Sequence, residues 1–316
     1  MPTQTTTPPA TEGGVQHVEI GQDREGQRLD NCLHALLKGV PRSLVYRLLR
    51  SGQVRVNGGR VKPGRRLAVG DVVRIPPVRQ STPGESRPPP ADQIRLIEQA
   101  IVHEDKHFLV VNKPSGLASH GGSGISHGVI ELLRHARPSE SLELVHRLDR
   151  ETSGIMVLTR RRAALTALQA LIRERKVTKQ YLALLDGRPE TARFDVNAPL
   201  GKFALAGGER VVRVEQGGKP SLSFFKRIED YRASSLHEVS LATGRTHQIR
   251  VHAAHVGHPV AGDDKYASRE SVARFRKAGL KRLFLHAARF EFDWQQQSYS
   301  FTAPLPEELK QVLDAL

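Results

Sequence analysis

The sequence predicts an α+β protein built from a small basic domain and a larger domain. Its length matches that of about two ordinary domains. The smaller part, 23–79, has the pattern of two short helices followed by short strands, and a proline-rich segment separates it from the rest. In the larger part, 97–316, strands outnumber helices and hairpins outnumber crossovers. This pattern predicts a mixed, largely antiparallel sheet with flanking helices.

Composition predicts an N-terminal tail and a linker between the two parts. Residues 1–22 contain no Lys or Arg and are rich in Thr, Gln, Pro and Gly, so we expect a disordered tail. Residues 80–96 form the expected linker, because Pro88, Pro89 and Pro90 disfavour a helix and remove backbone donors.

The small domain concentrates positive charge. Apolar residues at helical spacing predict helices over 29–37 and 41–50, and Asn57-Gly58 predicts a tight hairpin. The domain carries 13 basic and 4 acidic side chains, a net +9 of the chain's +15. This concentration predicts contacts with the phosphates of a nucleic acid, made by Arg42, Arg47, Arg50 and Arg55. The alternative is a solvated surface, whose charges are normally of mixed sign.

In the larger domain, apolar strands are expected at 108–112 and 179–185, with a helix over 162–176 between them. Gly217-Gly218 predicts a hairpin between 211–216 and 221–225, and Thr246 is the expected N-terminal cap of a later helix.

Several classes of protein do not fit this composition. The longest apolar run, 181–185, has five residues, whereas a membrane helix needs about 20. We therefore expect no membrane association, and the N-terminus lacks the pattern of a secretory signal. One cysteine, Cys32, forms no internal disulfide and excludes a multi-cysteine zinc site. The histidines from His247 to His258 lack a partnered carboxylate motif, so we expect no metal. The single cysteine and the missing secretory signal fit a cytoplasmic location.

Three polar segments differ from ordinary scaffold: 146–154, 179–181 and 243–252. Taken singly, each has a structural interpretation. Asp149 suits a turn, Arg245 suits a surface ion pair and Tyr181 suits a core position.

Taken together, the three segments resemble the motifs of the RluA-type family of pseudouridine synthases. They read His146-Arg-Leu-Asp149, Lys179-Gln-Tyr181 and Gly244-Arg-Thr-His-Gln-Ile-Arg250, in the family's order. Asn112-Lys-Pro-Ser-Gly116 also matches. The small domain resembles an S4 RNA-binding domain, through Gln27-Arg-Leu-Asp30 and Gly52-Gln-Val-Arg-Val-Asn57. The resemblance covers residues 20–316.

The resemblance implies that the protein isomerises uridines to pseudouridine in large-subunit ribosomal RNA. The base is detached from the sugar and rejoined through carbon 5, so neither a cofactor nor a metal is required. The expected partner is protein-free or early-assembly ribosomal RNA, and the expected state is a monomer. Within the family, a different ribosomal RNA position or a tRNA is the alternative substrate.

The resemblance also assigns residues. Asp149 is the catalytic carboxylate, Arg245 its ion-pair partner, and Tyr181 stacks on the uracil. Arg147 enters the RNA stack where the base was removed, since a guanidinium both stacks and donates hydrogen bonds. The expected RNA-binding set is completed by four further residues of the larger domain: His146, Lys113, His247 and Arg250.

Two interpretations from other classes remain. One is a non-catalytic RNA-binding protein with an S4 domain, which would require loss of the carboxylate that Asp149 supplies. The other is a glycoside hydrolase that uses Asp149 and Glu151 as its carboxylate pair, although such an enzyme has no evident need for a basic appended domain.

Overall fold

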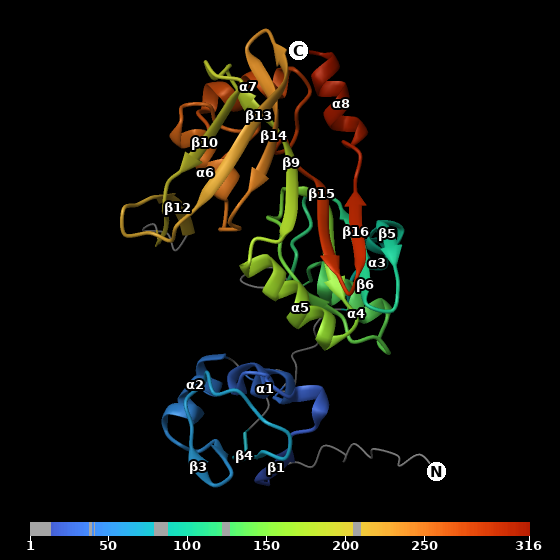
Figure 1. The fold of residues 1–316 in the computed structure, drawn as a ribbon, viewed down its shortest axis with the longest axis vertical. Helices are drawn as coiled ribbons and strands as arrows, with labels where there is room; N and C mark the ends of the chain where they lie inside the picture. Colours follow the sequence, from blue (N-terminus) through green and yellow to red (C-terminus); the bar gives the residue numbers. More distant parts are fainter. Residues whose placement is uncertain (1–13, 38–39, 41, 79–87, 122–126, 205–209) are drawn as a thin grey trace. The chain divides into compact units, whose positions relative to one another are not determined.

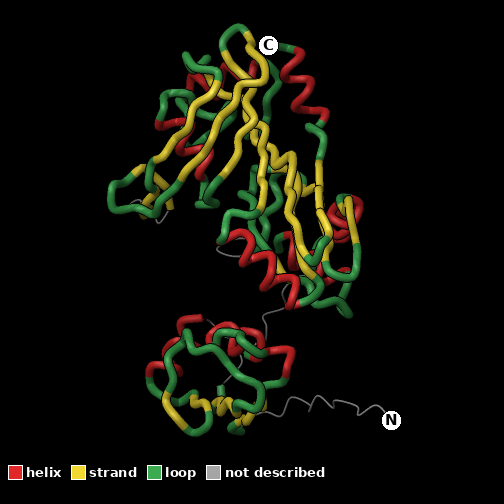
Figure 2. The backbone as a smooth tube through the Cα atoms, in the orientation of Figure 1, coloured by secondary structure: helices red, strands yellow, loops and turns green. Residues whose placement is uncertain are grey.

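The computed structural model describes residues 14–37, 40, 42–78, 88–121, 127–204 and 210–316. The chain divides into two compact units, 1–88 and 89–316, which are described separately below. Figure 1 gives the element labels, and Figure 2 shows which segments are helix, strand and loop.

The first unit packs short helices on a small antiparallel sheet with the strand order β1-β4-β2-β3. Its elements are β1 (Gln16–Glu19), the 3-10 helix η1 (Gln22–Arg24), α1 (Leu29–Leu36), α2 (Arg42–Arg50), β2 (Arg55–Val56), β3 (Gly59–Arg60) and β4 (Val72–Ile75). The predicted hairpin is confirmed: Asn57 and Gly58 both have positive φ, as the tight turn between β2 and β3 requires. Leu29, Leu33, Val45 and Val73 share one core.

The prediction of a disordered tail over 1–22 is wrong for its described part. β1 pairs with β4, and Ile20 is buried in the core of this unit. The signal was weak because β1 is short and polar, so its pairing depends on β4 and not on its own propensity. Residues 1–13 lie outside the described part of the chain.

The second unit is built on a long mixed sheet with the order β10-β13-β14-β9-β15-β8-β6-β5, which confirms the predicted fold class. The pairs are antiparallel except that β15 and β8 are parallel. Its strands are β5 (Ile101–Glu104), β6 (Phe108–Lys113), β7 (Glu143–Leu144), β8 (Ser153–Thr159), β9 (Val177–Asp186), β10 (Arg193–Asn197), β11 (Leu200–Ala204), β12 (Arg210–Val214), β13 (Leu222–Tyr231), β14 (Ser234–Leu241), β15 (Leu285–Trp294) and β16 (Gln297–Thr302).

Helices cover both faces of this sheet. They are α3 (Ala91–Gln99), α4 (Val129–Ala136), α5 (Arg162–Arg173), α6 (Gln248–His255), α7 (Arg269–Lys277) and α8 (Glu307–Asp314). Because side chains alternate along a strand, Phe108 and Val110 of β6 pack with α5, whereas Leu109 and Val111 pack with α3 and α4. In the other half of the sheet, α6 packs on one face and α7 and α8 on the other. β9 runs through the middle (Figure 1).

Two predictions for the second unit are wrong, one about the end of the linker and one about a hairpin. The linker predicted over 80–96 ends earlier, since α3 begins at Ala91, directly after Pro90. Proline fits at the start of a helix, where the missing N–H is not needed. The hairpin predicted around Gly217-Gly218 is not formed. β12 pairs instead with β11, and β13 pairs with β10 and β14.

None of the helices in the described ranges has the length and apolar character that crossing a membrane would require.

Candidate active site

A cavity of about 490 Å³ lies over the middle of the long sheet, between the end of α5 and the start of α6. Its walls come from the loop before β8, from β9 and from the turn before α6. Among the residues that the structure describes, only one acidic side chain lines it, that of Asp149. The basic side chains around it are those of Arg147, Arg173, Arg175, Lys179, Arg245 and Arg250. A single carboxylate inside a strongly positive cavity suits a reaction on a polyanion.

The segment 113–119 holds the loop that carries Asp149. The Ser119 hydroxyl donates to the Leu148 carbonyl at 2.7 Å and accepts from the Leu148 N–H at 2.9 Å. The Ser115 hydroxyl donates to the carbonyl of Glu151, and the Gly116 N–H donates to that of Arg150. These bonds fix the backbone on both sides of Asp149. The motif Asn112-Lys-Pro-Ser-Gly116 is therefore the support of the aspartate loop.

Lys113 is not placed to bind RNA, contrary to the sequence prediction. Its side chain is fully buried, and Nζ donates to three carbonyls, those of Pro114, Leu117 and Arg150, at 2.7–3.1 Å. Burial, followed by the nearby positive charge of Arg282, lowers the pKa of Lys113 to about 7. Lys113 thus ties the turn after β6 to the aspartate loop.

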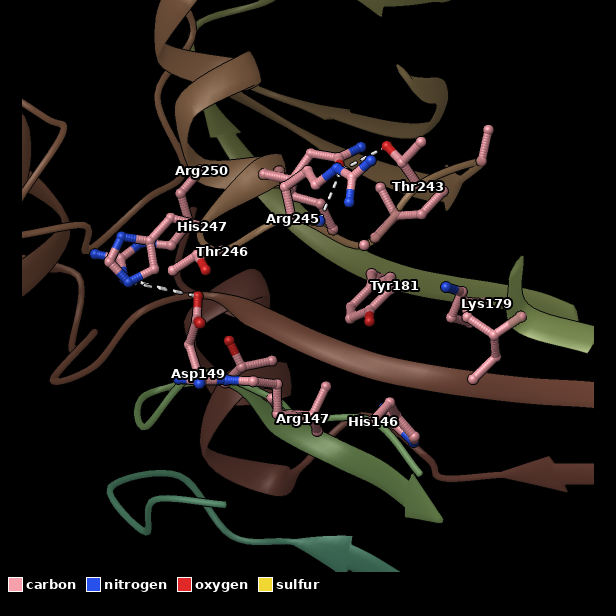
Figure 3. Close-up of a pocket in the computed structure, with 18 of the residues that line it drawn as sticks. His146, Arg147, Asp149, Lys179, Tyr181, Thr243, Arg245, Thr246, His247 and Arg250 are labelled. Carbon is pink, nitrogen blue, oxygen red and sulfur yellow. Dashed lines mark hydrogen bonds and ion pairs between the residues drawn. The ribbon is translucent and has the colours of Figure 1, made fainter. Parts of the chain in front are cut away.

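His146, also expected to contact RNA, is held by the scaffold through its ring and Nε2. Its ring stacks on Phe290 with a centroid distance of 4.8 Å, and Nε2 accepts the Val157 N–H at 3.1 Å. Burial, with a smaller contribution from Lys179, lowers its pKa to about 3, so the ring is neutral. In Figure 3 its side chain extends away from Asp149. A neutral ring that accepts a backbone N–H has no Nε2 proton to offer a phosphate.

Asp149 faces two basic groups, and the expected partner Arg245 is not one of them. Oδ2 of Asp149 lies 3.9 Å from Nε2 of His247 and 4.0 Å from Nη1 of Arg250. Among the described residues, no ion pair joins Asp149 to Arg245, whose Nε donates to the Pro220 carbonyl at 3.2 Å. Figure 3 shows Arg245 nearer to Thr243. Both arginines belong to one motif, and sequence reasoning chose the wrong one.

Arg250 is held by a second carboxylate. Its Nε and Nη2 donate to the two oxygens of Asp263 at 2.7 and 2.6 Å, which leaves Nη1 for Asp149. Arg250 and Asp263 are both buried, so Arg250 is not the RNA contact that the sequence predicted. A planar guanidinium held by this fork has a fixed orientation. Asp263 thereby determines where the charge opposite Asp149 lies.

Tyr181 lies on β9 and faces the cavity across from the aspartate loop (Figure 3). Burial is the main cause that raises the pKa of its hydroxyl, and the negative charge of Asp149 raises it further. The hydroxyl therefore stays protonated, and the ring offers a flat apolar surface beside the carboxylate.

Among the described residues, four exposed arginines line the cavity and can contact a large substrate. They are Arg147, Arg245, and Arg173 and Arg175 near the end of α5. Lys179 is partly buried, and burial lowers its pKa. These groups place positive charge at the entrance, whereas Arg250 places it beside Asp149.

In the first unit, Arg47 and Arg50 of α2 are exposed, and so is Arg55 of β2. Arg42 begins α2, but its side chain lies outside the described part of the structure. Exposure leaves the three described guanidinium groups accessible to phosphates.

Sequence reasoning missed Asp263 and Tyr266, both in the segment between α6 and α7. The Tyr266 hydroxyl bonds to Nδ1 of His247 at 2.7 Å, and Asp263 pairs with Arg250. A polar Gly262-Asp-Asp-Lys-Tyr266 turn directly after a motif helix was the available signal. Thr246 was expected to cap α6, but His247 occupies that position, in the left-handed region with φ 55°. Within the described ranges, no group of three or more potential ligands is arranged to hold a metal.

Comparison with known families finds two matches along the chain. Residues 107–255 match the RNA pseudouridylate synthase family, and residues 27–73 match the S4 domain. Two solved human structures are similar. RNA Pseudouridylate Synthase Domain Containing 4 is 26% identical, with a TM-score of 0.59 over 71% of this chain and 95% of that one. Domain Containing 1 is 29% identical, with a TM-score of 0.56 over 66% and 83%.

Curated relatives extend over nearly the whole chain. The ribosomal large subunit pseudouridine synthase C of Pasteurella multocida is 49% identical over 96% of this chain and 94% of its own length. The Escherichia coli protein of the same name is 49% identical over 96% and 97%. With the S4 match, the mixed sheet and the single carboxylate in a basic cavity, this similarity shows that the chain belongs to the RNA pseudouridine synthase family.

Proposed function

We propose that this protein converts uridines of large-subunit ribosomal RNA to pseudouridine, with Asp149 as the reacting group and without a cofactor. The observation that carries the proposal is the position of Asp149, which among the described residues is the one carboxylate of a cavity whose charged groups are otherwise basic. The named activity of the relatives supports the same substrate.

The cavity suggests a role for each wall. Asp149 acts on the sugar or the base of the extruded uridine, while Arg250 places a positive charge opposite the carboxylate. Tyr181 stacks on the uracil, and Arg147 fills the space that the base leaves in the RNA stack. Extrusion costs about a few kcal/mol, which contacts with the exposed arginines offset.

The S4 match and the exposed arginines of the first unit support a role for that unit in RNA affinity. Phosphate contacts of this kind give affinity that falls with salt and carries little sequence choice. We propose that the protein acts as a monomer in the cytoplasm, on ribosomal RNA before assembly is complete.

The experiment is to incubate the purified protein with transcribed fragments of large-subunit ribosomal RNA and map pseudouridines. The expected result is conversion at specific uridines by the native protein alone, without added metal or cofactor. A tRNA panel tests the alternative substrate. Absence of conversion in every fragment, by protein that is folded and binds RNA, would overturn the proposal.

A further inference from the structure

Tyr266 lies behind both groups that face Asp149. Its hydroxyl is 2.7 Å from Nδ1 of His247, and its ring lies under the Arg250 guanidinium, with 5.2 Å from Cζ to the ring centroid. The Tyr266 N–H also donates to Asp263, the carboxylate that orients Arg250. One side chain therefore contacts both parts of the surroundings of Asp149.

The hydrogen bonds of the Tyr266 hydroxyl determine its direction. The oxygen accepts the Val212 N–H at 3.2 Å, and a phenol has a single proton to give. Among the described residues, Nδ1 of His247 is the acceptor recorded for that proton. Nδ1 is then unprotonated, and the proton of the neutral imidazole is on Nε2, which points at Asp149 (Figure 3).

The charge state of His247 agrees with this direction. Burial is the largest influence and lowers the pKa of His247, against the smaller opposing effect of Asp149. The groups that act on the ring from the elements around it are Asp149, Arg250, Lys265 and Asp263.

Both donors approach the same oxygen of Asp149. His247 Nε2 and Arg250 Nη1 lie 3.9 and 4.0 Å from Oδ2, and among the described residues Oδ1 has neither an ion pair nor a hydrogen bond. A shift of about 1 Å brings either donor within hydrogen-bond distance of Oδ2. Oδ1 is then the oxygen that is left to react.

We propose that Tyr266 is a positioning residue. By donating to Nδ1 it holds His247 as the Nε2–H tautomer, and this donor, together with Arg250, anchors Oδ2 of Asp149 and leaves Oδ1 toward the uridine. This inference rests on the proposed function for its kinetic consequence, but the tautomer itself is independent of any activity.

Tyr266→Phe removes the hydroxyl and keeps the ring under Arg250. We expect the single-turnover rate of pseudouridine formation to fall by about tenfold, the typical value of one hydrogen bond, with RNA affinity within about twofold. Tyr231→Phe is the matched control. It also removes a hydroxyl that donates to a neighbour, Glu229, but it lies at the end of β13 outside the cavity, so its rate should equal that of the native protein.

A double-mutant cycle with His247→Asn separates positioning from simple support of β12. Asparagine tolerates the left-handed backbone of residue 247 but has no ring for Tyr266 to orient. In the His247→Asn background, Tyr266→Phe should no longer change the rate. If the two effects simply multiply, the hydroxyl acts elsewhere and the proposal is overturned.

The tautomer is tested in the native protein by nitrogen NMR of the His247 ring. The expected state is protonated Nε2 and unprotonated Nδ1, and in Tyr266→Phe this preference should weaken. A His247 ring protonated on Nδ1 in the native protein would overturn the proposal. This result does not depend on whether the variants fold. If the native protein modifies no RNA, the proposed function fails, but this spectrum still decides the direction of the hydrogen bond.

Discussion

Nη1 of Arg250 lies 4.0 Å from Oδ2 of Asp149, and Asp263 holds the other two nitrogens of the same guanidinium. The position of the positive charge opposite the reacting carboxylate is therefore determined by the buried Arg250–Asp263 ion pair and not by an exposed side chain. Arg245, five residues earlier, is exposed and donates to a backbone carbonyl. The two arginines of one motif thus have different surroundings, and substitutions at them should have different effects.

Arg250→Lys should lower the single-turnover rate by about a hundredfold, because a lysine cannot hold both oxygens of Asp263 and also face Asp149. Arg245→Lys is the matched control and should lower the rate less than about tenfold, with its main effect on RNA affinity. Rates are measured at saturating enzyme. Equal losses in the two variants would contradict the assignment of Arg250.

Substitutions of Lys113 and Arg147 should have different effects, the first mainly on stability and the second on activity, although both residues are basic and near Asp149. Lys113→Met removes the ammonium donor of three carbonyls, of which, in the described part of the chain, only that of Arg150 keeps a backbone donor, the Gly116 N–H, and it should lower the free energy of unfolding by about 2 kcal/mol or more. Arg147→Ala removes an exposed side chain and should leave stability within about 0.5 kcal/mol while reducing activity. Urea denaturation and activity assays distinguish them. A stable Lys113→Met protein would show that these bonds do not hold the aspartate loop.

Acid should destabilise the second unit through His286. Burial is the main cause that lowers the pKa of His286 to about 4, and the hydrogen bond from Nε2 to the Ala303 carbonyl opposes it. Nδ1 bonds to the Ser153 hydroxyl. An unfolded histidine binds its proton near pH 6.5, so stability is full above that pH and falls as the pH drops toward about 4. The slope from this group is at most about 1.4 kcal/mol per pH unit.

His286→Gln should make the pH dependence of the free energy of unfolding flatter between about 4 and 6.5. His255, exposed at the end of α6, provides the control, because His255→Gln should leave the slope unchanged. Unfolding curves at several pH values give the slopes. The same slope in His286→Gln and in the native protein would show that burial of His286 does not carry this dependence.

Removal of residues 1–88 should leave a folded second unit, because the two units have separate cores. Residues 23–79 carry a net +9, so RNA affinity should fall and its dependence on salt should become weaker. Titrations of both proteins at several salt concentrations measure this. An unchanged salt dependence would mean that the first unit does not contact the RNA.

Local patterns were sufficient for most of the fold. The apolar run of β6, the helical spacing in α5 and the Asn57-Gly58 turn all predicted their elements, because each depends on neighbours in sequence. β1 and the β11–β12 pair were missed or mispaired, because their partners are chosen by tertiary contacts.

The candidate site shows the same division. The motifs identified Asp149 and Tyr181 as lining residues. Spacing alone cannot show that Arg245 is exposed and that Arg250, five residues later, is buried. Arg250 is buried because Asp263 closes on it from the segment after α6, and Lys113 is buried because three carbonyls surround its ammonium group. Both facts depend on the assembled fold.

The most direct test is pseudouridine formation by Asp149→Asn under single-turnover conditions with a ribosomal RNA fragment that the native protein modifies. The amide keeps the shape of the side chain and removes its negative charge, so RNA binding should stay within about twofold while conversion falls below detection. Asp149→Asn that is folded, free of native enzyme and still converts uridine at a substantial fraction of the native rate would contradict the assignment of Asp149 as the reacting group.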